Sequence, residues 1–134
     1  MEQLKVLELL EAVRVYERKI NLSLTYSGLR LPQFKVMDFL EKSGKITVSD
    51  LSRHTNVTRA TTSVLVNELI KLGIVESVKN SSDKRSFYIT LTERGKNRLT
   101  VARSEFSIVE EKISNELSNK SIECLNNFSK IIRN

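Results

Sequence analysis

The sequence predicts a mainly α-helical protein with one small β-hairpin, and three observations support this fold class. Apolar residues recur every three or four positions through most of the 134 residues, as they do along one face of a helix. Two short helical segments follow one another between positions 47 and 72, each with a threonine at its start. After Gly73 the pattern becomes the one typical of strands, and helical spacing returns beyond Thr92.

The first 46 residues predict two helices. The first predicted helix ends at about residue 28. Its apolar residues are spaced for one face of a helix: Val6, Leu10, Val13, Tyr16, Ile20 and Leu24. Gly28 ends this helix, and Pro32 suits the first turn of the next one, where its missing N–H would have no helical partner. The apolar face of that second helix consists of Val36, Met37, Phe39 and Leu40, and Gly44 ends it.

The next two helices form a helix-turn-helix. Thr47 can accept a hydrogen bond from a free backbone N–H, and the acidic Asp50 follows three positions later, as at the start of a capped helix. This helix runs to about His54. Thr58 begins another that runs to about Leu72. A separation of about three residues is typical of a helix-turn-helix.

The remaining chain predicts a hairpin and two further helices. Residues 74–78 and 86–91 are expected to be strands, joined by a basic turn, residues 79–85, that is too hydrophilic to pack. A long helix begins at Thr92 and has an apolar face made of Leu99, Ala102, Phe106, Val109, Ile113 and Leu117. Ser118 and Asn119 interrupt it. The last helix carries Ile122, Leu125, Phe128 and Ile132.

Composition excludes several classes of protein and favours one kind of partner. The net charge is +6, and residues 47–98 hold nine basic against five acidic residues, so the excess positive charge lies in the middle of the chain, which favours a polyanionic partner. One cysteine, Cys124, and one histidine, His54, exclude a disulfide framework and a His/Cys metal cluster.

We expect no enzyme, no cofactor and no metal, because the sequence has neither a phosphate-binding glycine loop nor a nucleophile–base pair. No apolar run is long enough for a membrane span, and the first residues lack the basic-then-apolar pattern of a signal peptide. We therefore expect no membrane partner and a cytoplasmic location.

A helix-turn-helix followed directly by a hairpin with a basic tip is a winged helix-turn-helix. A helix fits the major groove of DNA, and an arginine on a hairpin can enter the minor groove. The run from Asp83 to Gly95 resembles the wing signature of the MarR (multiple antibiotic resistance regulator) family, in which an acidic residue, a spacer and an arginine precede a strand ending in Leu-Thr and a glycine-containing helix start. Leu31-Pro32-Gln33-Phe34, Leu69 and Gly73-Ile74-Val75-Glu76 also match that family's pattern.

The resemblance implies a homodimer that binds a pseudo-palindromic operator. In this interpretation the chain is one domain, residues 1–134, with the winged helix-turn-helix at about 32–92 and dimerisation helices at about 1–28 and 93–134. The apolar faces of the terminal helices independently exceed what so thin a monomer could bury, and two-fold dimers are the commonest oligomers. Their recognition helices would lie about 34 Å apart, one turn of DNA.

Six residues of the recognition helix are expected to face the groove: Thr58, Arg59, Ala60, Ser63, Val64 and Asn67. Thr61, Leu65 and Leu69 form a stripe that should face the core, yet Thr58 and Thr61 also lie where hydroxyl and N–H groups can hold phosphate. Arg59 can bind guanine or phosphate, and Asn67 either pairs with adenine or is only solvated. Many family members carry a base-reading arginine at the position of Val64, which can offer only an apolar contact, for instance to a thymine methyl.

The wing supplies three further candidates. Arg85 is expected to enter the minor groove while Asp83 fixes its direction, and Lys84 is expected to contact phosphate. The alternative is a solvated surface pair of Asp83 and Arg85, which contributes less than about 1 kcal/mol.

Five aromatic residues are core residues or, as the resemblance implies, line a crevice for a small, phenolic effector: Tyr16, Tyr26, Phe34, Phe39 and Phe106. Such a ligand would favour a spacing of the recognition helices that does not match the operator. Cys124 is expected to be a buried apolar residue rather than an oxidant sensor, and His54 a surface residue or phosphate contact.

The sequence therefore predicts a sequence-specific DNA-binding transcriptional regulator, a repressor released by a small ligand. The alternative is a protein that uses the same fold for non-specific architectural DNA binding or for protein interaction. The valine at position 64 keeps this alternative open.

Overall fold

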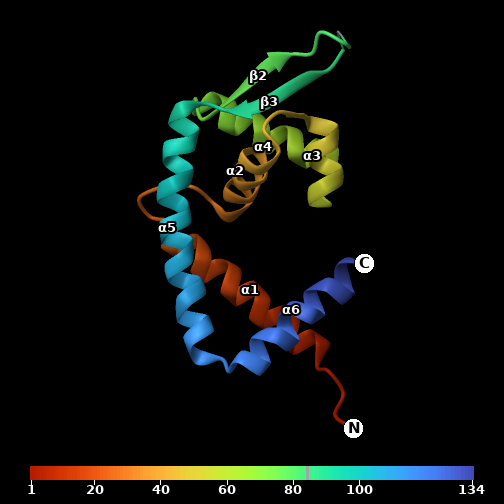
Figure 1. Ribbon diagram of the computed structural model, residues 1–134, viewed down its shortest axis with the longest axis vertical. Coiled ribbons are helices and arrows are strands. Elements are labelled where there is room, and N and C mark those ends of the chain that lie inside the picture. Colours follow the sequence, from red (N-terminus) through yellow and green to blue (C-terminus); the bar gives the residue numbers. More distant parts are fainter. Residues whose placement is uncertain (84) are drawn as a thin grey trace.

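The computed structural model describes residues 1–83 and 85–134, and its architecture confirms the predicted fold class. The elements in chain order are α1 (Val6–Ser23), α2 (Leu31–Ser43), β1 (Ile46–Thr47), α3 (Val48–Thr55), α4 (Arg59–Lys71), β2 (Val75–Lys79), β3 (Phe87–Leu91), α5 (Glu93–Glu116) and α6 (Asn119–Arg133). A lobe made of α2, α3, α4 and the strands lies at one end of α5, and an arm made of α1 and α6 lies at the other (Figure 1).

The three strands form one antiparallel sheet in the order β1-β3-β2. Ile89 of β3 pairs with Ser77 of β2 on one side and with Ile46 of β1 on the other. The hairpin of β2 and β3 was predicted, whereas β1 was not. Two residues are too few to show the alternation of a strand, so this pairing has no detectable sequence pattern.

Side-chain caps begin four of the helices. The hydroxyls of Thr47, Thr58, Thr92 and Ser118 each accept a hydrogen bond from the backbone N–H three residues later. The caps at Thr47 and Thr58 confirm the predicted starts of the helix-turn-helix. Ser118 was expected only to interrupt the long helix, and it also starts α6.

The hydrophobic core lies inside the lobe, where α2 is covered by α4, the sheet and the first half of α5. Its fully buried side chains come from each of these elements and from α3: Met37, Leu40, Leu51, Leu69, Ile74, Ile89 and Leu99. The core therefore fixes α4 relative to the sheet. Any surface formed by both is held rigid by close packing.

Gly95 lets α5 pass directly over the strand that leads into the hairpin. A Cβ atom at this position would lie 2.0 Å from the carbonyl oxygen of Ile74, which no side chain could tolerate. The same carbonyl accepts a hydrogen bond from the N–H of Thr92 at 3.2 Å, and the Thr92 hydroxyl donates to the carbonyl of Gly73 at 2.9 Å. The start of α5 is thereby joined to the base of the hairpin.

The arm leaves much of its apolar surface uncovered. Ile20 is the buried residue of α1, and all residues of α6 are exposed or half-buried. Large exposed apolar side chains cluster on the two helices and the segment before α1: Leu4, Leu7, Leu10, Val13, Leu125, Ile131 and Ile132. Cys124 is exposed, so the expectation of a buried cysteine is wrong for the single chain, because α6 extends away from the core.

Two properties of the described residues bear on other classes of protein. Within residues 1–83 and 85–134, no helix is both long and apolar enough to cross a membrane. In the same part of the chain, no three His, Cys, Asp or Glu side chains gather as metal ligands would.

Candidate nucleic-acid interface

Helix α4 presents one buried and one exposed face. Thr62, Val66 and Leu69 are buried against the lobe. The predicted reading residues lie on the other side: Thr58, Arg59, Ala60, Val64 and Asn67 are exposed, and Ser63 is half-buried. Val64 is 58% exposed, so an apolar side chain occupies the middle of this polar face.

Thr61 is not a core residue, contrary to the prediction that it shares a buried stripe with Leu65 and Leu69. It is exposed in the first turn of α4 and takes part in the cap of that helix. Its N–H donates to Thr58 Oγ1 at 3.2 Å, and the Thr58 hydroxyl donates to Thr61 Oγ1 at 3.0 Å. The N–H groups of Arg59 and Ala60, the first in the helix, are therefore better placed than that of Thr61 to bind phosphate.

A polar cluster joins α4 to the start of α2. Glu68 of α4 accepts hydrogen bonds from Arg30 Nη2 at 2.8 Å and from Gln33 Nε2 at 3.2 Å. Gln33 is buried, and its Oε1 accepts from the Arg30 N–H at 3.0 Å. Sequence reasoning missed this cluster, although the Leu-Pro-Gln-Phe motif contains the glutamine that makes it.

Arg85 lies at the tip of the hairpin with its side chain 95% exposed. The carboxylate of Asp83 accepts a hydrogen bond from the Arg85 N–H at 2.9 Å, and Arg85 Nε lies 3.8 Å from the same oxygen. Asp83 therefore orients Arg85 mainly through the backbone. Lys84, the predicted phosphate contact, lies outside the described residues. The hairpin runs away from α5, and its tip lies on the α3 side of the lobe (Figure 1).

One residue of the wing turn packs against its neighbours, contrary to the prediction. Asn80 is buried, and its Oδ1 accepts from the Ser82 N–H at 3.0 Å while its Nδ2 donates to Ser86 Oγ at 2.9 Å. The expectation of a turn too hydrophilic to pack is therefore wrong for Asn80. An asparagine that bonds its own backbone two residues on is a common turn device, and this residue type was the available clue.

The five aromatic residues do not line a common crevice. Phe34 and Phe106 stack on each other, with ring centroids 5.0 Å apart, whereas Phe39 packs on His54 at 5.3 Å. Tyr26 is 90% exposed in the turn after α1, not on a helix. Tyr16 is half-buried against the core, and burial, followed by the charge of Glu110, raises the pKa of its hydroxyl. In the single chain these rings therefore have separate partners, because helical spacing does not determine which neighbour each ring meets.

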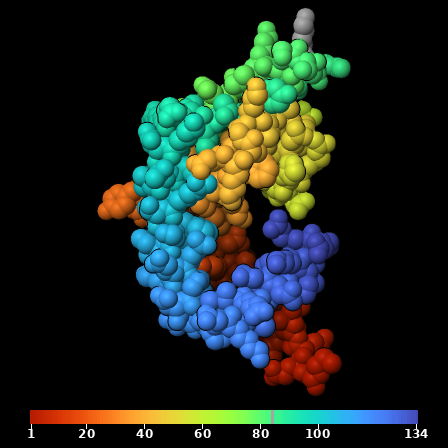
Figure 2. Space-filling model, viewed as in Figure 1, coloured from red at the N-terminus to blue at the C-terminus, as the bar shows by residue number. Residues whose placement is uncertain are grey.

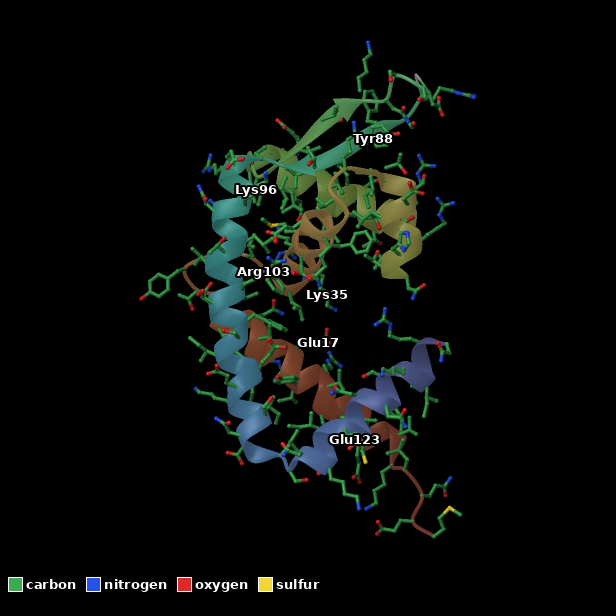
Figure 3. The ribbon with its side chains drawn as sticks, viewed as in Figure 1. Glu17, Lys35, Tyr88, Lys96, Arg103 and Glu123 are labelled. Carbon is green, nitrogen blue, oxygen red and sulfur yellow. The ribbon has the colours of Figure 1, made fainter. Side chains whose placement is uncertain are left out.

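Charged side chains of α5 hold the lobe and the α1–α2 loop in place. Arg103, labelled in Figure 3, donates to Asp38 Oδ1 from Nη2 at 2.6 Å and also to Glu41, both on α2. Burial raises the pKa of the Asp38 carboxyl, but hydrogen bonds from Arg103 and Lys42 outweigh this and leave the pKa lowered. Glu105 accepts from the N–H of Tyr26 at 2.8 Å and of Ser27 at 3.0 Å.

The exposed face of α4, its capped N-terminus and the projecting hairpin define a winged helix-turn-helix protein. The model of the MarR family matches residues 27–86, which form most of the lobe. Over these residues the chain is similar to the MarR family of winged helix proteins.

Comparisons with known proteins agree with this family. The chain is 35% identical over 74 residues to the HTH-type transcriptional repressor YetL of Bacillus subtilis, covering 54% of this chain and 44% of YetL. The chain thus spans about half the length of the curated relatives it matches.

Two solved structures share the fold over nearly the whole chain. A mutant of MarR from E. coli in complex with operator DNA has a TM-score of 0.86 at 21% identity, covering 93% of this chain and 91% of that one. NadR in complex with 4-hydroxyphenylacetate has a TM-score of 0.77 at 18% identity, covering 98% and 94%. At these identities the likeness is one of fold.

Proposed function

We propose that this protein is a transcriptional regulator, acting as a repressor, that binds a pseudo-palindromic DNA operator as a homodimer. The observation that carries the proposal is the pairing of two exposed elements on one rigid lobe. Arg59, Val64 and Asn67 lie open on α4, and Arg85 extends from the wing. This arrangement suits a helix in the major groove and an arginine in the adjacent minor groove.

Two further observations support DNA as the partner. The basic surplus lies in the segment that forms α3, α4 and the hairpin. A protein of the same fold, E. coli MarR, has been solved on operator DNA, and the related YetL is a transcriptional repressor. A protein that acts on the chromosome in this way belongs in the cytoplasm and needs no enzymatic activity.

The uncovered apolar face of the arm supports the homodimer. Residues of α1 and α6 such as Leu10 and Ile132 expose more than half of their surface in the single chain. Exposed apolar surface of this extent marks an interface. A two-fold dimer through the arm would place two α4 helices about 34 Å apart, which fits half-sites one turn of DNA apart.

Selection of bound fragments from a random DNA pool tests the proposal. A regulator enriches one palindromic sequence at physiological salt, and unrelated competitor DNA fails to displace it at concentrations that displace non-specific binding. Enrichment of no sequence, with equal competition by any DNA, would instead support the architectural alternative. Val64→Ala sharpens the test, because it should weaken the preference at a single base position only.

A small aromatic or phenolic effector that releases the DNA remains part of the proposal. NadR, which shares the fold, has been solved with 4-hydroxyphenylacetate. The aromatic residues singled out from the sequence have separate partners in the single chain, so the site of the effector is left open in this proposal.

A further inference from the structure

The exposed face of α4 ends in a positive charge. Four exposed residues, three or four positions apart, form one row along this helix: Ala60, Val64, Asn67 and Lys71. The row lies opposite the residues that α4 buries in the lobe. Its first three members were predicted to face the groove, whereas Lys71 was not. The face expected to read DNA therefore continues to a lysine at the C-terminal end of the helix.

A second cation reaches the same end of α4 from α5. The guanidinium of Arg94 lies beside Gly73, since a Cβ atom at Gly73 would be 3.6 Å from Arg94 Nη1. Gly73 has a positive φ of 74°, and its lack of a side chain leaves room for the guanidinium next to the backbone. The start of α5, in teal, lies at the surface of the lobe, at the end away from the wing tip (Figure 2).

No acidic side chain in the described part of the chain balances these two charges. Lys71 and Arg94 are exposed, and neither belongs to an ion pair closer than 4.0 Å there. The neighbouring Lys96 differs, because its Nζ lies 3.3 Å from a carboxylate oxygen of Glu93. Two uncompensated cations at one end of a helix favour an anionic partner.

Arg94 also occupies an unfavourable position within its own helix. It is the second residue of α5, and a positive charge in the first turn opposes the helix dipole. Lys71 lies in the last turn of α4, where a cation stabilises the helix by itself. The dipole therefore explains Lys71 but not Arg94. A negatively charged ligand that reaches both side chains explains the pair.

The length of α4 places this end of the helix beside the DNA backbone. From Ala60 to Lys71 the helix rises by about 16 Å, whereas the major groove of B-DNA is about 12 Å wide. In helix-turn-helix proteins the first residues of the recognition helix contact the base edges. When the first turn of α4 does so, Lys71 lies beyond the edge of the groove, where the phosphates are.

We propose that Lys71 and Arg94 bind phosphates of the DNA backbone, as a second contact at the end of the lobe opposite the wing tip. This inference rests on the proposed function, because it takes α4 to lie in the major groove. Arg85 then holds the DNA on one side of α4, and Lys71 and Arg94 hold it on the other. Contacts on both sides fix the register and orientation of the lobe on the duplex.

Such a contact suits a recognition helix with an apolar residue in its middle. Val64, which is 58% exposed, offers the bases no hydrogen bond. Phosphate contacts raise the affinity for every sequence alike, because they carry no sequence information. They supply affinity that this helix does not obtain from an arginine at position 64.

The salt dependence of binding tests the contact. Lys71→Gln and Arg94→Gln should each reduce the slope of log affinity against log salt by about one, because each lost cation displaces one counterion fewer. The double variant should reduce the slope by about two. At 0.1 M salt each single variant should bind about tenfold more weakly. Fluorescence anisotropy of the full chain on a random-sequence duplex of about two helical turns measures both quantities.

The operator, once selected, gives a second readout that separates phosphate contacts from base contacts. K71Q and R94Q should weaken binding to the operator and to the random duplex by the same factor. A loss of affinity confined to the operator would show that these residues read bases and would overturn the proposal.

Lys96→Gln is the matched control. Lys96, labelled in Figure 3, lies two residues after Arg94, so its side chain leaves α5 on the opposite side of the helix. Its charge is already paired with Glu93, and the salt slope should not change. An equal reduction of the slope in K96Q would show an effect of net charge alone and would overturn the proposal.

Urea unfolding tests the alternative that the two cations serve only the fold. In that case K71Q and R94Q would unfold at lower urea concentrations than the wild type, and their salt slopes would equal that of the wild type. This result would refute the contact.

Uncharged phosphates locate the contact on the DNA. Single methylphosphonates placed along the operator should weaken binding of the wild type at the contacted position but have little further effect on the K71Q/R94Q double variant there. The same loss in both proteins at every position would contradict the proposal.

Operator selection separates this inference from the proposed function. If no sequence is enriched but the slope on the random duplex falls in K71Q and R94Q, the backbone contact stands and the proposed function fails. If an operator is enriched but the slope stays the same in both variants, the proposed function stands and the contact fails.

Discussion

Two residues of the wing turn hold Arg85 at its tip. Asp83 fixes the Arg85 backbone N–H, and Asn80 closes the turn beneath it through Ser82 and Ser86. The arginine side chain itself makes little contact with the rest of the hairpin. Its position depends on the turn, and its charge remains available to a partner.

Replacement of that charge is the most direct test of the wing. Arg85→Ala should lower operator affinity by about 1–3 kcal/mol and reduce the slope of log affinity against log salt by about one, since one cation no longer displaces a counterion. Fluorescence anisotropy at several salt concentrations measures both quantities. Lys112→Ala, on the distal part of α5, is the matched control and should change neither. An unaltered slope in R85A would exclude a DNA contact by this residue.

Asn80 should matter to the same binding without touching DNA. Asn80→Ala removes two hydrogen bonds from a buried position and should lower the free energy of unfolding by about 1–3 kcal/mol. Operator affinity should fall as well, because the tip that carries Arg85 is no longer fixed. Urea unfolding and anisotropy provide the two measurements, with the exposed neighbour in Ser81→Ala as the control. If Ser81→Ala weakened operator binding as much as Asn80→Ala, the loss of affinity would not be specific to the hydrogen bonds of Asn80.

At the scale of elements, α5 connects the hairpin base to the arm. Gly95 allows it to lie against Ile74, and Arg103 joins it to α2. These two contacts, one steric and one ionic, hold the first half of α5 to the lobe. Each gives a separate prediction.

Gly95→Ala should destabilise the protein, although alanine is the better helix former by about 1 kcal/mol. The added methyl group would overlap the Ile74 carbonyl oxygen, and such overpacking costs about 1–3 kcal/mol or more. Thermal and urea unfolding measure the effect. Asn97→Ala, exposed on the same helix, should be neutral or slightly stabilising. A G95A protein as stable as the wild type would mean that α5 can move away from the strand at little cost.

Asp38 should make stability depend on pH in the acid range. Its pKa in the folded protein is lowered by Arg103 and Lys42 despite burial, so its contribution is present above the unfolded pKa and is lost as pH falls through the folded one. The free energy of unfolding should therefore decrease below about pH 4, and Asp38→Asn should flatten this decrease. Urea unfolding at a series of pH values tests it. Asp83→Asn is the control. If the free energy of unfolding of D38N fell with decreasing pH as steeply as that of the wild type, Asp38 would not be the source of the pH dependence.

At the scale of the whole molecule, the lobe is complete in one chain and the arm is not. The lobe has a closed core, whereas α6 contributes no side chain to that core among the described residues. The single chain therefore has one well-packed part and one part with much uncovered apolar surface. This division matches the proposed split between DNA reading and dimerisation.

Leu125→Glu should dissociate the proposed dimer, because it places a charge in the apolar face of α6, where Leu125 is 47% exposed in the single chain. Analytical ultracentrifugation should detect a monomer at concentrations where the wild type is dimeric. Leu72→Glu changes a leucine of similar exposure, 42%, on the lobe and should leave the mass unchanged. A dimeric L125E protein would show that α6 is outside the interface.

Sequence patterns predicted the helices, two of their caps and the hairpin because each depends on residues close together in the chain, although α1 ends at Ser23 and not near Gly28. The Thr47 and Thr58 caps and the Pro32 helix start are examples. Contacts between distant segments were not predictable in this way. The Glu68–Arg30–Gln33 cluster, the exposure of Thr61 and the separate partners of Phe34 and Phe39 all depend on how helices pack, which spacing within one helix does not determine.

The uninterrupted length of α5 has a mechanical consequence. Its 24 residues extend over about 36 Å from the hairpin base to the arm. A tilt of only about 5° about one end would move the other end by about 3 Å, roughly the length of a hydrogen bond. Small rotations at the arm are therefore magnified into displacements large enough, under the proposed function, to move α4 out of register with the base edges.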